Sequence, residues 1–213
     1  MQTGALRPYE ESLRAGGGGV LSLVSDSTVV HLDVARWLAD VDETDDEVLR
    51  RCHGPVLDIG CGPGRFVRAL TQLGIPALGV DIAETAVEIT RRSGGSALGR
   101  SVFEPLPAEG RWPTILLMDG NVGIGGDVVR LLRRVAEILE QQGLLIVECA
   151  PQDEVDEVLS VRFSSCDKAM GPEFAWARMG SAALRRQAPS CGYSVEETFV
   201  RQGRSFVCLR LRP

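Results

Sequence analysis

The 213-residue sequence is short of basic charge, of long apolar runs and of paired cysteines. Its formal net charge is −6 and no basic run with interleaved aromatics occurs, which argues against a nucleic-acid partner. No stretch approaches the about 18 consecutive apolar residues of a transmembrane helix, so we expect no membrane partner. Residues 1–11 lack the basic and then apolar layout of a signal peptide, and we therefore expect a cytoplasmic location.

Lysine and cysteine are distributed in ways that exclude several common kinds of site. Lys168 is the only lysine among 23 basic residues, which we interpret as the codon bias of a GC-rich bacterial genome. The cysteines form no C-x-x-C pair, so we expect free thiols and no metal site. The six positions are Cys52, Cys61, Cys149, Cys166, Cys191 and Cys208.

The most informative segment is a short apolar run that leads into three glycines at alternate positions. Residues 55–59 form the run, and Gly60, Gly62 and Gly64 follow it. An amphipathic pattern from Phe66 predicts a helix directly after the loop. A strand, a glycine loop and a helix present backbone N–H groups and a positive helix end to a ligand, so this loop is predicted to bind one.

The spacing of these glycines distinguishes two families. A dinucleotide site needs G-x-G-x-x-G, but Arg65 stands where the third glycine belongs. The pattern D-x-G-x-G-x-G from Asp58 to Gly64 resembles the first motif of class I S-adenosylmethionine (SAM) methyltransferases. The resemblance extends from about residue 55 to the C-terminus and is sharpest over residues 56–81 and 117–127. It implies SAM as the cofactor.

A second acidic residue agrees with a nucleoside ligand. Residues 76–80 predict the next strand, which ends on Asp81. A carboxylate at this point can accept two hydrogen bonds from a ribose diol, in SAM or in NAD alike. Asp81 also precedes a helix predicted at about residues 83–93 and could cap it. We favour ribose binding, because the position matches the topology of the glycine loop.

Alternating strand and helix patterns predict an α/β fold. Two alternating strands, at residues 193–200 and 205–211, are joined by a connection too short for a parallel crossover, so they form an antiparallel hairpin. Further strands are expected at residues 97–103, 113–118 and 143–149, and helices at 128–139 and 181–188. The family resemblance implies a Rossmann-like, seven-stranded, mostly parallel sheet in the order 3-2-1-4-5-7-6.

Two parts of the chain differ in character. Residues 1–53 are predicted to be an N-terminal helical lid or extension, with helices near residues 8–15 and 32–39 that pack over the carboxyl edge of the sheet. Residues 54–213 are predicted to be the SAM-binding methyltransferase domain. Residues 151–172 read as a polar connection.

In an open α/β sheet, ligands bind beyond the carboxyl ends of the strands. This rule and the resemblance predict the cofactor-binding residues Asp58, Gly60, Cys61, Gly62, Gly64, Asp81, Ile82, Ser101, Val102, Asp119, Gly120 and Asn121. Tyr9 joins them, because it resembles a tyrosine that closes over the cofactor in some small-molecule methyltransferases. Ser101 and Val102 stand where the family often has an acidic residue that contacts adenine, and Glu104 is the alternative for that contact.

Candidates for catalysis and acceptor binding follow from what methyl transfer needs. In-line positioning supplies most of the rate, and a general base is needed only for a nucleophile of high pKa. His31 is the candidate base, with an ordinary, partly buried histidine as the alternative, and Asn121 could orient the nucleophile. Trp176 and Arg178 are predicted to line the acceptor pocket, with Arg178 pairing a carboxylate, unless the aromatic residue packs in the core.

The expected function is SAM-dependent methyl transfer to a small-molecule acceptor, with oxygen favoured over nitrogen or carbon. Residues 116–127 look like those of bacterial methyltransferases of biosynthetic clusters, which favours specialised metabolism. The alternatives are an NAD(P)-dependent oxidoreductase and a SAM-binding regulatory protein without transferase activity. The sequence leaves the acceptor and the oligomeric state open.

Overall fold

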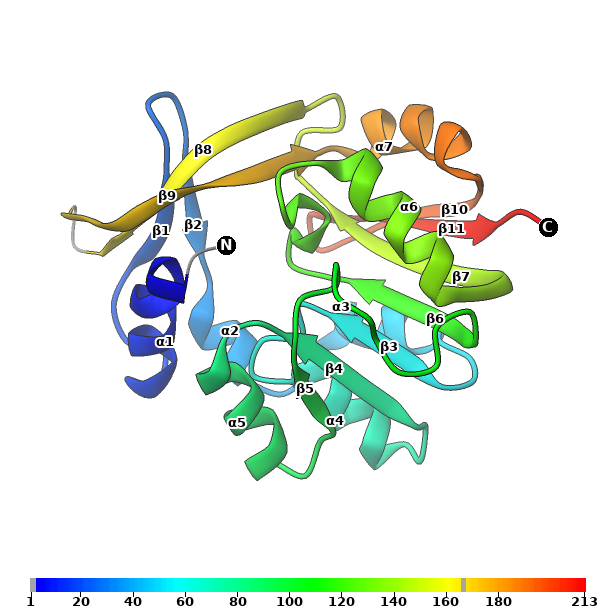
Figure 1. Cartoon of the computed structure of the whole chain (residues 1–213), viewed down its shortest axis with the longest axis horizontal. Coiled ribbons are helices and arrows are strands. Elements are labelled where there is room, and N and C mark those ends of the chain that lie inside the picture. Colours follow the sequence, from blue (N-terminus) through cyan, green and yellow to red (C-terminus); the bar gives the residue numbers. More distant parts are fainter. Residues whose placement is uncertain (1–2, 166–167) are drawn as a thin grey trace.

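The computed structural model describes residues 3–165 and 168–213 and contains a seven-stranded and a four-stranded β-sheet (Figure 1). The strands of the larger sheet are β3 (Val56–Ile59), β4 (Ala77–Asp81), β5 (Ala97–Gly99), β6 (Trp112–Leu117), β7 (Leu139–Cys149), β10 (Tyr193–Arg201) and β11 (Arg204–Leu211). Their spatial order is β5-β4-β3-β6-β7-β11-β10, and only β11 runs antiparallel to its neighbours. Counted along the chain, this is the predicted order 3-2-1-4-5-7-6 with its terminal hairpin.

Helices cover both faces of the seven-stranded sheet. On one face α3 (Glu43–Leu49) and α4 (Arg65–Gln72) pack against the strands, with Leu70 beside Leu116 in one core cluster. On the other face α6 (Val128–Ile138) and α7 (Ser181–Gln187) bury Leu131 with Leu117. Because both faces are covered, the inner strands are continuous apolar runs, as is typical of parallel sheets.

Shorter elements complete the described chain. Helix α5 (Glu84–Arg92) follows β4 and contacts the N-terminal helix α1 (Arg7–Arg14). Three-residue and four-residue 3₁₀ turns occupy η1 (Thr3–Leu6), η2 (Asn121–Gly123) and η3 (Ala188–Cys191). The η2 turn lies directly after β6, at the carboxyl edge of the sheet. It therefore helps to shape the edge where ligands are expected.

The predicted N-terminal extension is helical only in part. Helix α1 confirms the helix expected at residues 8–15, and α2 (Val34–Leu38) forms the middle of the one expected at 32–39. Between them β1 (Leu21–Val24) and β2 (Val29–Leu32) form an antiparallel hairpin, so the description as a helical extension was wrong. Each strand has four residues, and a pattern this short does not distinguish a strand from a helical segment.

The four-stranded sheet joins this hairpin to a second one from the C-terminal half. Strands β8 (Asp156–Ser165) and β9 (Lys168–Met179) complete the order β2-β1-β8-β9, with Leu23 opposite Phe163. The prediction of a polar connection at residues 151–172 was therefore wrong. Val158 of β8 is apolar but 64% exposed. Polar and apolar residues alternate in β8, so its buried face could not be recognised from the sequence.

The described part of the chain has neither a membrane-spanning helix nor a metal-binding group of side chains. Residues 3–165 and 168–213 include no helix with the length and apolar character needed to cross a membrane. The same residues hold no group of three or more His, Cys, Asp or Glu side chains that could bind a metal ion. Five cysteines are free thiols, and the prediction for Cys166 lies outside the described residues.

Candidate functional site

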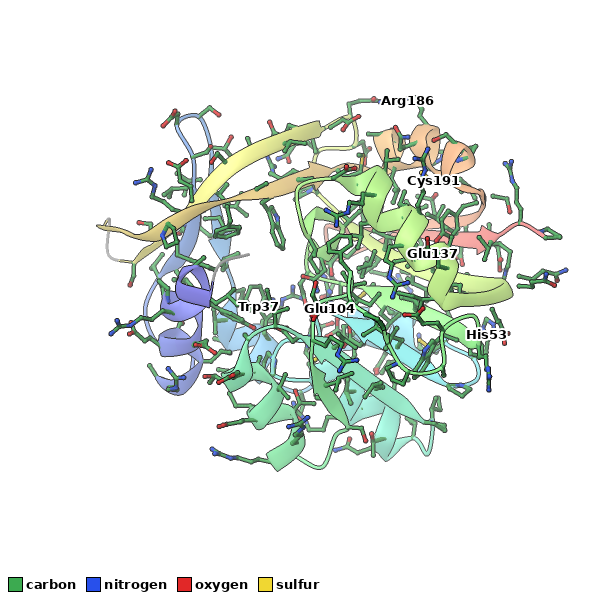
Figure 2. The ribbon with its side chains drawn as sticks, viewed as in Figure 1. Trp37, His53, Glu104, Glu137, Arg186 and Cys191 are labelled. Atoms are coloured by element: carbon green, nitrogen blue, oxygen red, sulfur yellow. The ribbon has the colours of Figure 1, made fainter. Side chains whose placement is uncertain are left out.

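A cavity of about 1120 Å³ lies between the two sheets. Residues after β3, β4, β6 and β7 form one wall, and α1, α2, β2, β8 and β9 supply the other. Figure 2 shows side chains from both sheets projecting into the region between them, where Trp37 of α2 is labelled. All the site residues predicted from the sequence line this cavity except Gly64. The carboxyl ends of the strands therefore meet a cavity, as the sheet rule requires.

Two glycines keep the loop after β3 open to close approach. Gly60 has a φ of 71°, and a Cβ there would lie 2.6 Å from the amide nitrogen of Asn121. Gly62 has a φ of 53°, and a Cβ there would lie 3.1 Å from the hydroxyl oxygen of Tyr9. A side chain at either position would be strained and would crowd the cavity wall.

Gly64 was predicted to bind the cofactor, but it does not line the cavity. It is the N-cap of α4, and a Cβ there would come within 2.5 Å of the Thr90 side chain. The Thr90 hydroxyl donates to the carbonyl oxygen of Gly62 at 3.1 Å, which ties α5 to the loop. Gly64 therefore serves the packing of α4 against α5 and not the wall of the cavity.

Asp81 connects the glycine loop to the start of α5. One carboxylate oxygen accepts from the backbone N–H of Gly62 at 2.9 Å, and the other accepts from Ala83 at 2.8 Å. Each oxygen keeps acceptor capacity for a further donor. Burial raises the pKa of Asp81, and the hydrogen bonds from Ala83 and Gly62 oppose that rise. The side chain is thus a fixed double acceptor on the cavity wall.

Asp58 and Cys61 are buried on the same wall. Burial, with the nearby charge of Asp119, raises the pKa of Asp58 to about 7. Burial, with Asp81 and Asp58 nearby, raises the pKa of the Cys61 thiol well above its usual range. A thiol held protonated is a poor nucleophile, so Cys61 acts by its small size. Gly79 of β4 accommodates it, since a Cβ there would lie 2.5 Å from the Cys61 sulfur.

The loop after β6 holds Asp119, Gly120 and Asn121. Asp119 has a φ of 55°, in the left-handed region that a non-glycine residue rarely adopts. The Asn121 amide nitrogen donates to the carbonyl oxygens of Ile59 at 3.1 Å and Gly60 at 2.8 Å. Asn121 therefore fixes the glycine loop against η2, and its predicted role in orienting a nucleophile stays a prediction.

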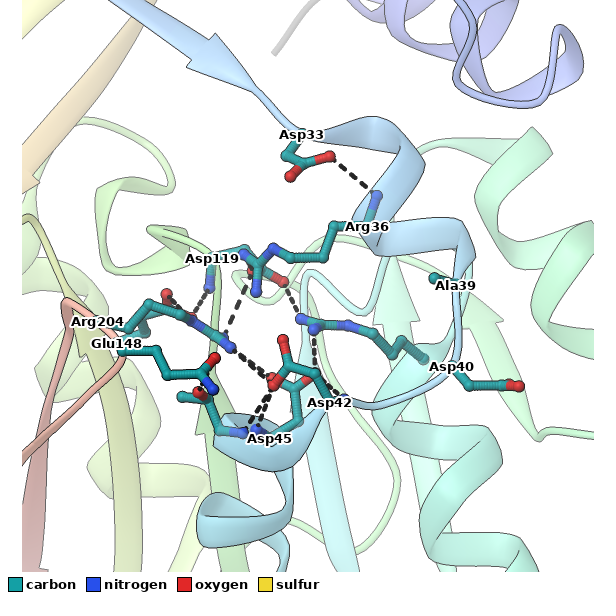
Figure 3. Close-up of polar contacts among 12 residues, drawn as sticks. Asp33, Arg36, Ala39, Asp40, Asp42, Asp45, Asp119, Glu148 and Arg204 are labelled. Atoms are coloured by element: carbon teal, nitrogen blue, oxygen red, sulfur yellow. Dashed lines mark hydrogen bonds and ion pairs between the residues drawn. The ribbon is translucent and has the colours of Figure 1, made fainter.

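A buried cluster of charges lies beneath this loop (Figure 3). We define the charge cluster as Arg36, Arg65, Arg204, Asp45, Asp119 and Glu148. Arg65 is 3% exposed and pairs with Asp45 and, at 2.8 Å, with Asp119. Arg204 reaches Glu148 and Asp45, each at 2.8 Å. Side chains that are charged and buried need such partners.

Most of the charge cluster was missed by sequence reasoning. Asp119 was predicted to contact the cofactor, but its carboxylate is already paired with Arg36 and Arg65. Arg65 directly follows the glycine loop, and Asp45 lies in an acidic stretch, so each gave a weak local signal. Arg204 lies in the C-terminal hairpin and gave none. Only the fold brings these segments together.

Tyr9 and His31 lie on the wall supplied by the N-terminal extension. Burial raises the pKa of Tyr9 well above its usual range, and the charge of Asp81 adds to the effect. The Nδ1 atom of His31 lies 2.9 Å from the Ser22 hydroxyl, across the β1–β2 pair. Tyr9 is thus a neutral cover over Gly62, and the ring of His31 is oriented by Ser22.

Trp176 and Arg178 alternate along β9 and line the cavity. Trp176 is half-buried and packs edge-on against Phe174, with ring centroids 6.4 Å apart. The Arg178 guanidinium pairs with Glu157 at 2.5 Å and donates to the Gln152 side chain at 2.7 Å. The charge of Arg178 is therefore balanced within the protein, and its predicted pairing with a substrate carboxylate stays a prediction.

Ser101, Val102 and Ile82 line the end of the cavity near β4 and β5. The backbone N–H of Ser101 donates to the Glu104 carboxylate at 2.8 Å, and the Ser101 hydroxyl accepts from Phe103 at 3.3 Å. Glu104 itself does not line the cavity, so the alternative adenine contact lies behind the wall. Elsewhere around the cavity, three buried donors of described residues lack a partner: Arg36 Nη1, Trp37 Nε1 and Arg65 Nε.

Comparison with known proteins places the glycine loop in a methyltransferase domain. A family model described as a methyltransferase domain matches residues 56–143. The ubiquinone biosynthesis O-methyltransferase of Bartonella tribocorum is 31% identical over 97 residues, which cover 43% of this chain and 39% of that protein. The chain thus matches only about two fifths of the length of this curated relative. These matches give no support to the NAD(P)-dependent alternative.

Solved structures extend the likeness to the whole fold. A SAM-dependent methyltransferase from Bacteroides fragilis, solved with S-adenosyl-L-homocysteine, has a TM-score of 0.80 at 18% identity and covers 98% of this chain and 95% of that one. The 1,6-didemethyltoxoflavin-N1-methyltransferase of Burkholderia thailandensis has a TM-score of 0.58 at 15% identity, covering 78% and 74%. Residues 56–143 thus match a methyltransferase domain, and the strand order and glycine loop belong to a chain with the fold of SAM-dependent methyltransferases.

Proposed function

We propose that this protein is an enzyme that transfers a methyl group from SAM to a small-molecule acceptor, with an oxygen atom as the favoured acceptor atom. The O-methyltransferase name of the Bartonella relative supports oxygen as the acceptor atom. The S-adenosyl-L-homocysteine bound in the Bacteroides structure supports SAM as the cofactor. The single observation that carries the proposal is one continuous cavity. It holds the glycine loop and Asp81 on one side and an aromatic wall on the other.

The residues of the glycine-loop wall fit SAM. Close approach at Gly60 and Gly62 leaves room for the adenosyl part, and the Asp81 carboxylate can accept both ribose hydroxyls. When bound, SAM would supply a methyl group on a sulfonium sulfur, and the C–S bond would break, releasing S-adenosylhomocysteine, as the acceptor atom bonds to the methyl carbon. The contribution of the protein is to hold the acceptor atom in line with that group and to exclude water.

The size of the cavity agrees with two ligands. Its volume of about 1120 Å³ exceeds the roughly 300–1,000 Å³ of ordinary single-ligand pockets. The cavity can therefore hold the cofactor and a small acceptor together, and it need not admit a macromolecule. The net charge of −6 also disfavours a nucleic-acid acceptor.

His31 is the proposed general base. It lines the acceptor side of the cavity and its Nδ1 atom is held by Ser22, so the other ring nitrogen remains for a substrate. For a hydroxyl acceptor, the oxygen forms the new C–O bond as its proton passes to His31. This assignment needs only one proton acceptor and no metal ligand.

We further propose that the first 53 residues act as a lid together with β8 and β9. Tyr9, Trp37 and His31 of that segment line the cavity, so its displacement would open the site. We also propose that the protein is a cytoplasmic enzyme of bacterial specialised metabolism.

Calorimetric titration with SAM and with S-adenosylhomocysteine tests the proposal. We expect micromolar binding of both, with the product at least as tight, followed by methylation within a panel of phenols, amines and acids. Absence of binding to either compound would refute the SAM site. Binding of SAM with no methylated acceptor would favour the regulatory, non-catalytic alternative.

A further inference from the structure

The aromatic side chains of this protein are concentrated around the cavity. Aromatic residues make up 5% of the sequence, which contains 3 Trp, 2 Tyr and 6 Phe. Seven of these eleven side chains line the cavity. Phe66 and Phe163 among them also belong to the hydrophobic core, whereas the other five rings are only partly buried where they line the cavity. Their location points to a function in the cavity.

Five of the rings form a continuous series along the wall opposite the glycine loop. Trp37 packs edge-on against Tyr9, with centroids 5.9 Å apart, and Tyr9 lies nearly parallel to Phe163 at 6.4 Å. Phe163 contacts Phe174 at 5.4 Å, and Phe174 contacts Trp176 at 6.4 Å. These separations fall within the range of favourable ring pairs, so the series forms one aromatic surface. We call it the aromatic wall.

The aromatic wall belongs to segments outside the matched methyltransferase domain at residues 56–143. Tyr9 and Trp37 come from α1 and α2, and Phe163, Phe174 and Trp176 come from β8 and β9. The cofactor residues Gly60, Gly62 and Asp81 lie within the matched domain. Tyr9 lies beside Gly62 at the cofactor side, and we infer that the other four rings face an acceptor.

Glu173, Arg178 and His31 beside the aromatic wall already have polar partners, whereas the buried Nε1 donor of Trp37 has none among the described residues. Glu173 lines the cavity but bonds Ser160 at 2.8 Å and pairs with Arg162. Arg178 is balanced by Glu157, and His31 is bonded to Ser22. A charged acceptor would therefore lose hydration here without gaining an uncommitted counter-charge from these residues.

We propose that the acceptor is a flat, uncharged aromatic molecule that stacks on the aromatic wall and presents its nucleophilic atom toward the glycine loop. The inference rests on the proposed methyltransferase function, since it assigns the second ligand of the same cavity. Stacking accounts for the concentration of rings, and neutrality accounts for the committed charges. Rings fixed in this way recognise a planar outline better than a flexible aliphatic chain.

A pair of probes with the same carbon skeleton, one planar and aromatic and one saturated, tests the proposal. Calorimetry at saturating S-adenosylhomocysteine would compare 2-naphthol with decahydro-2-naphthol. We expect 2-naphthol to bind at least about 10-fold more tightly, because only its planar ring can pair with the aromatic wall. Equal affinities, or no detectable binding of either probe, would overturn the proposal.

Two matched variants locate the binding. Phe174 and Phe199 are both half-buried strand residues, but only Phe174 lines the cavity. Phe174→Leu should weaken 2-naphthol binding about 3- to 10-fold and leave S-adenosylhomocysteine affinity unchanged. Phe199→Leu should change neither affinity. An unchanged 2-naphthol affinity in Phe174→Leu would refute stacking on this wall.

Failure of the proposed function would look different. If S-adenosylhomocysteine does not bind, the SAM site is wrong whatever the probes do. The two probes would then be titrated against the free protein, where preference for 2-naphthol and its loss in Phe174→Leu would still support an aromatic ligand. If S-adenosylhomocysteine binds and the probes are not distinguished, the cofactor site stands and the aromatic acceptor is refuted.

Discussion

The two sheets of this protein differ in how their strands are covered. The inner strands of the seven-stranded sheet are buried on both faces, as in β3, where all four residues are buried. In the four-stranded sheet, β2 and most of β8 alternate between exposed and partly covered residues. The larger sheet carries the glycine loop, whereas the smaller one carries most of the aromatic wall. The glycine loop and the aromatic wall therefore come from differently covered parts of the molecule that meet at the cavity.

The charge cluster connects α2 and α3 of the N-terminal segment to the seven-stranded sheet, so breaking it should have the largest effect. Arg65→Ala leaves Asp45, which is fully buried, and Asp119 short of a partner. We expect a loss of about 3–5 kcal/mol in the free energy of unfolding, measured by urea denaturation. Arg68→Ala is the control, because Arg68 pairs with the exposed Asp40 and should cost no more than about 1 kcal/mol. Equal losses in both variants would contradict a special role for the cluster.

Asp58 should make the stability of the larger sheet depend on pH. Its pKa of about 7 in the folded state exceeds the ordinary 3.8, so the folded protein retains a proton that the unfolded chain releases. This contribution is complete below about pH 4 and is lost as the pH rises to about 7, up to about 4 kcal/mol in total. Asp58→Asn should reduce the loss of stability between pH 4.5 and pH 8.

Urea denaturation of both proteins at the two pH values measures this difference. Glu84→Gln, at an exposed position in α5, is the control and should keep the wild-type pH dependence. The assignment to Asp58 would fail if Asp58→Asn showed the same pH dependence as the wild type.

Substitution of Asp81 should weaken the binding of the cofactor. Asp81→Asn removes the charge and keeps one oxygen for the Ala83 N–H, so the start of α5 survives, but its amide nitrogen cannot accept from the Gly62 N–H. Two charge-assisted hydrogen bonds to the ribose are weakened, and we expect SAM affinity to fall about 100-fold by calorimetry. Asp127→Asn, at the cap of α6 away from the cavity, should bind SAM normally. Normal SAM affinity in Asp81→Asn would contradict the ribose contact.

The smallest effect is expected at the start of α3, in the N-terminal segment. Asp42 accepts from the backbone N–H of Thr44 and of Asp45, each at 2.8 Å, and forms a capping box. Asp42→Ala should lower the free energy of unfolding by about 1 kcal/mol in thermal or urea denaturation. Glu43→Ala, at an exposed first-turn position, should have a smaller effect. The reverse order would argue against the cap.

Local patterns predicted the larger sheet well. Residues 113–118 and 143–149 are apolar because parallel strands are covered on both faces, and both lie in β6 and β7 almost as expected. The hairpin of β10 and β11 followed from its short connection. The four-stranded sheet was not predicted, because β1 pairs with β8, which lies in the C-terminal half of the chain. No local pattern carries that pairing.

The family resemblance implied the order of the strands. The sequence by itself determined the glycine loop, Asp81 and the positions of the parallel strands. These depend on residue type and spacing within short segments, since φ preference and apolar periodicity are local properties. The tertiary structure alone decided the charge cluster and the aromatic wall. Arg36, Arg65 and Arg204 share carboxylates only after three separate segments meet, and Tyr9 reaches Phe163 only after α1 packs on β8. Contacts between distant segments depend on the packing of the whole chain, which no single segment encodes.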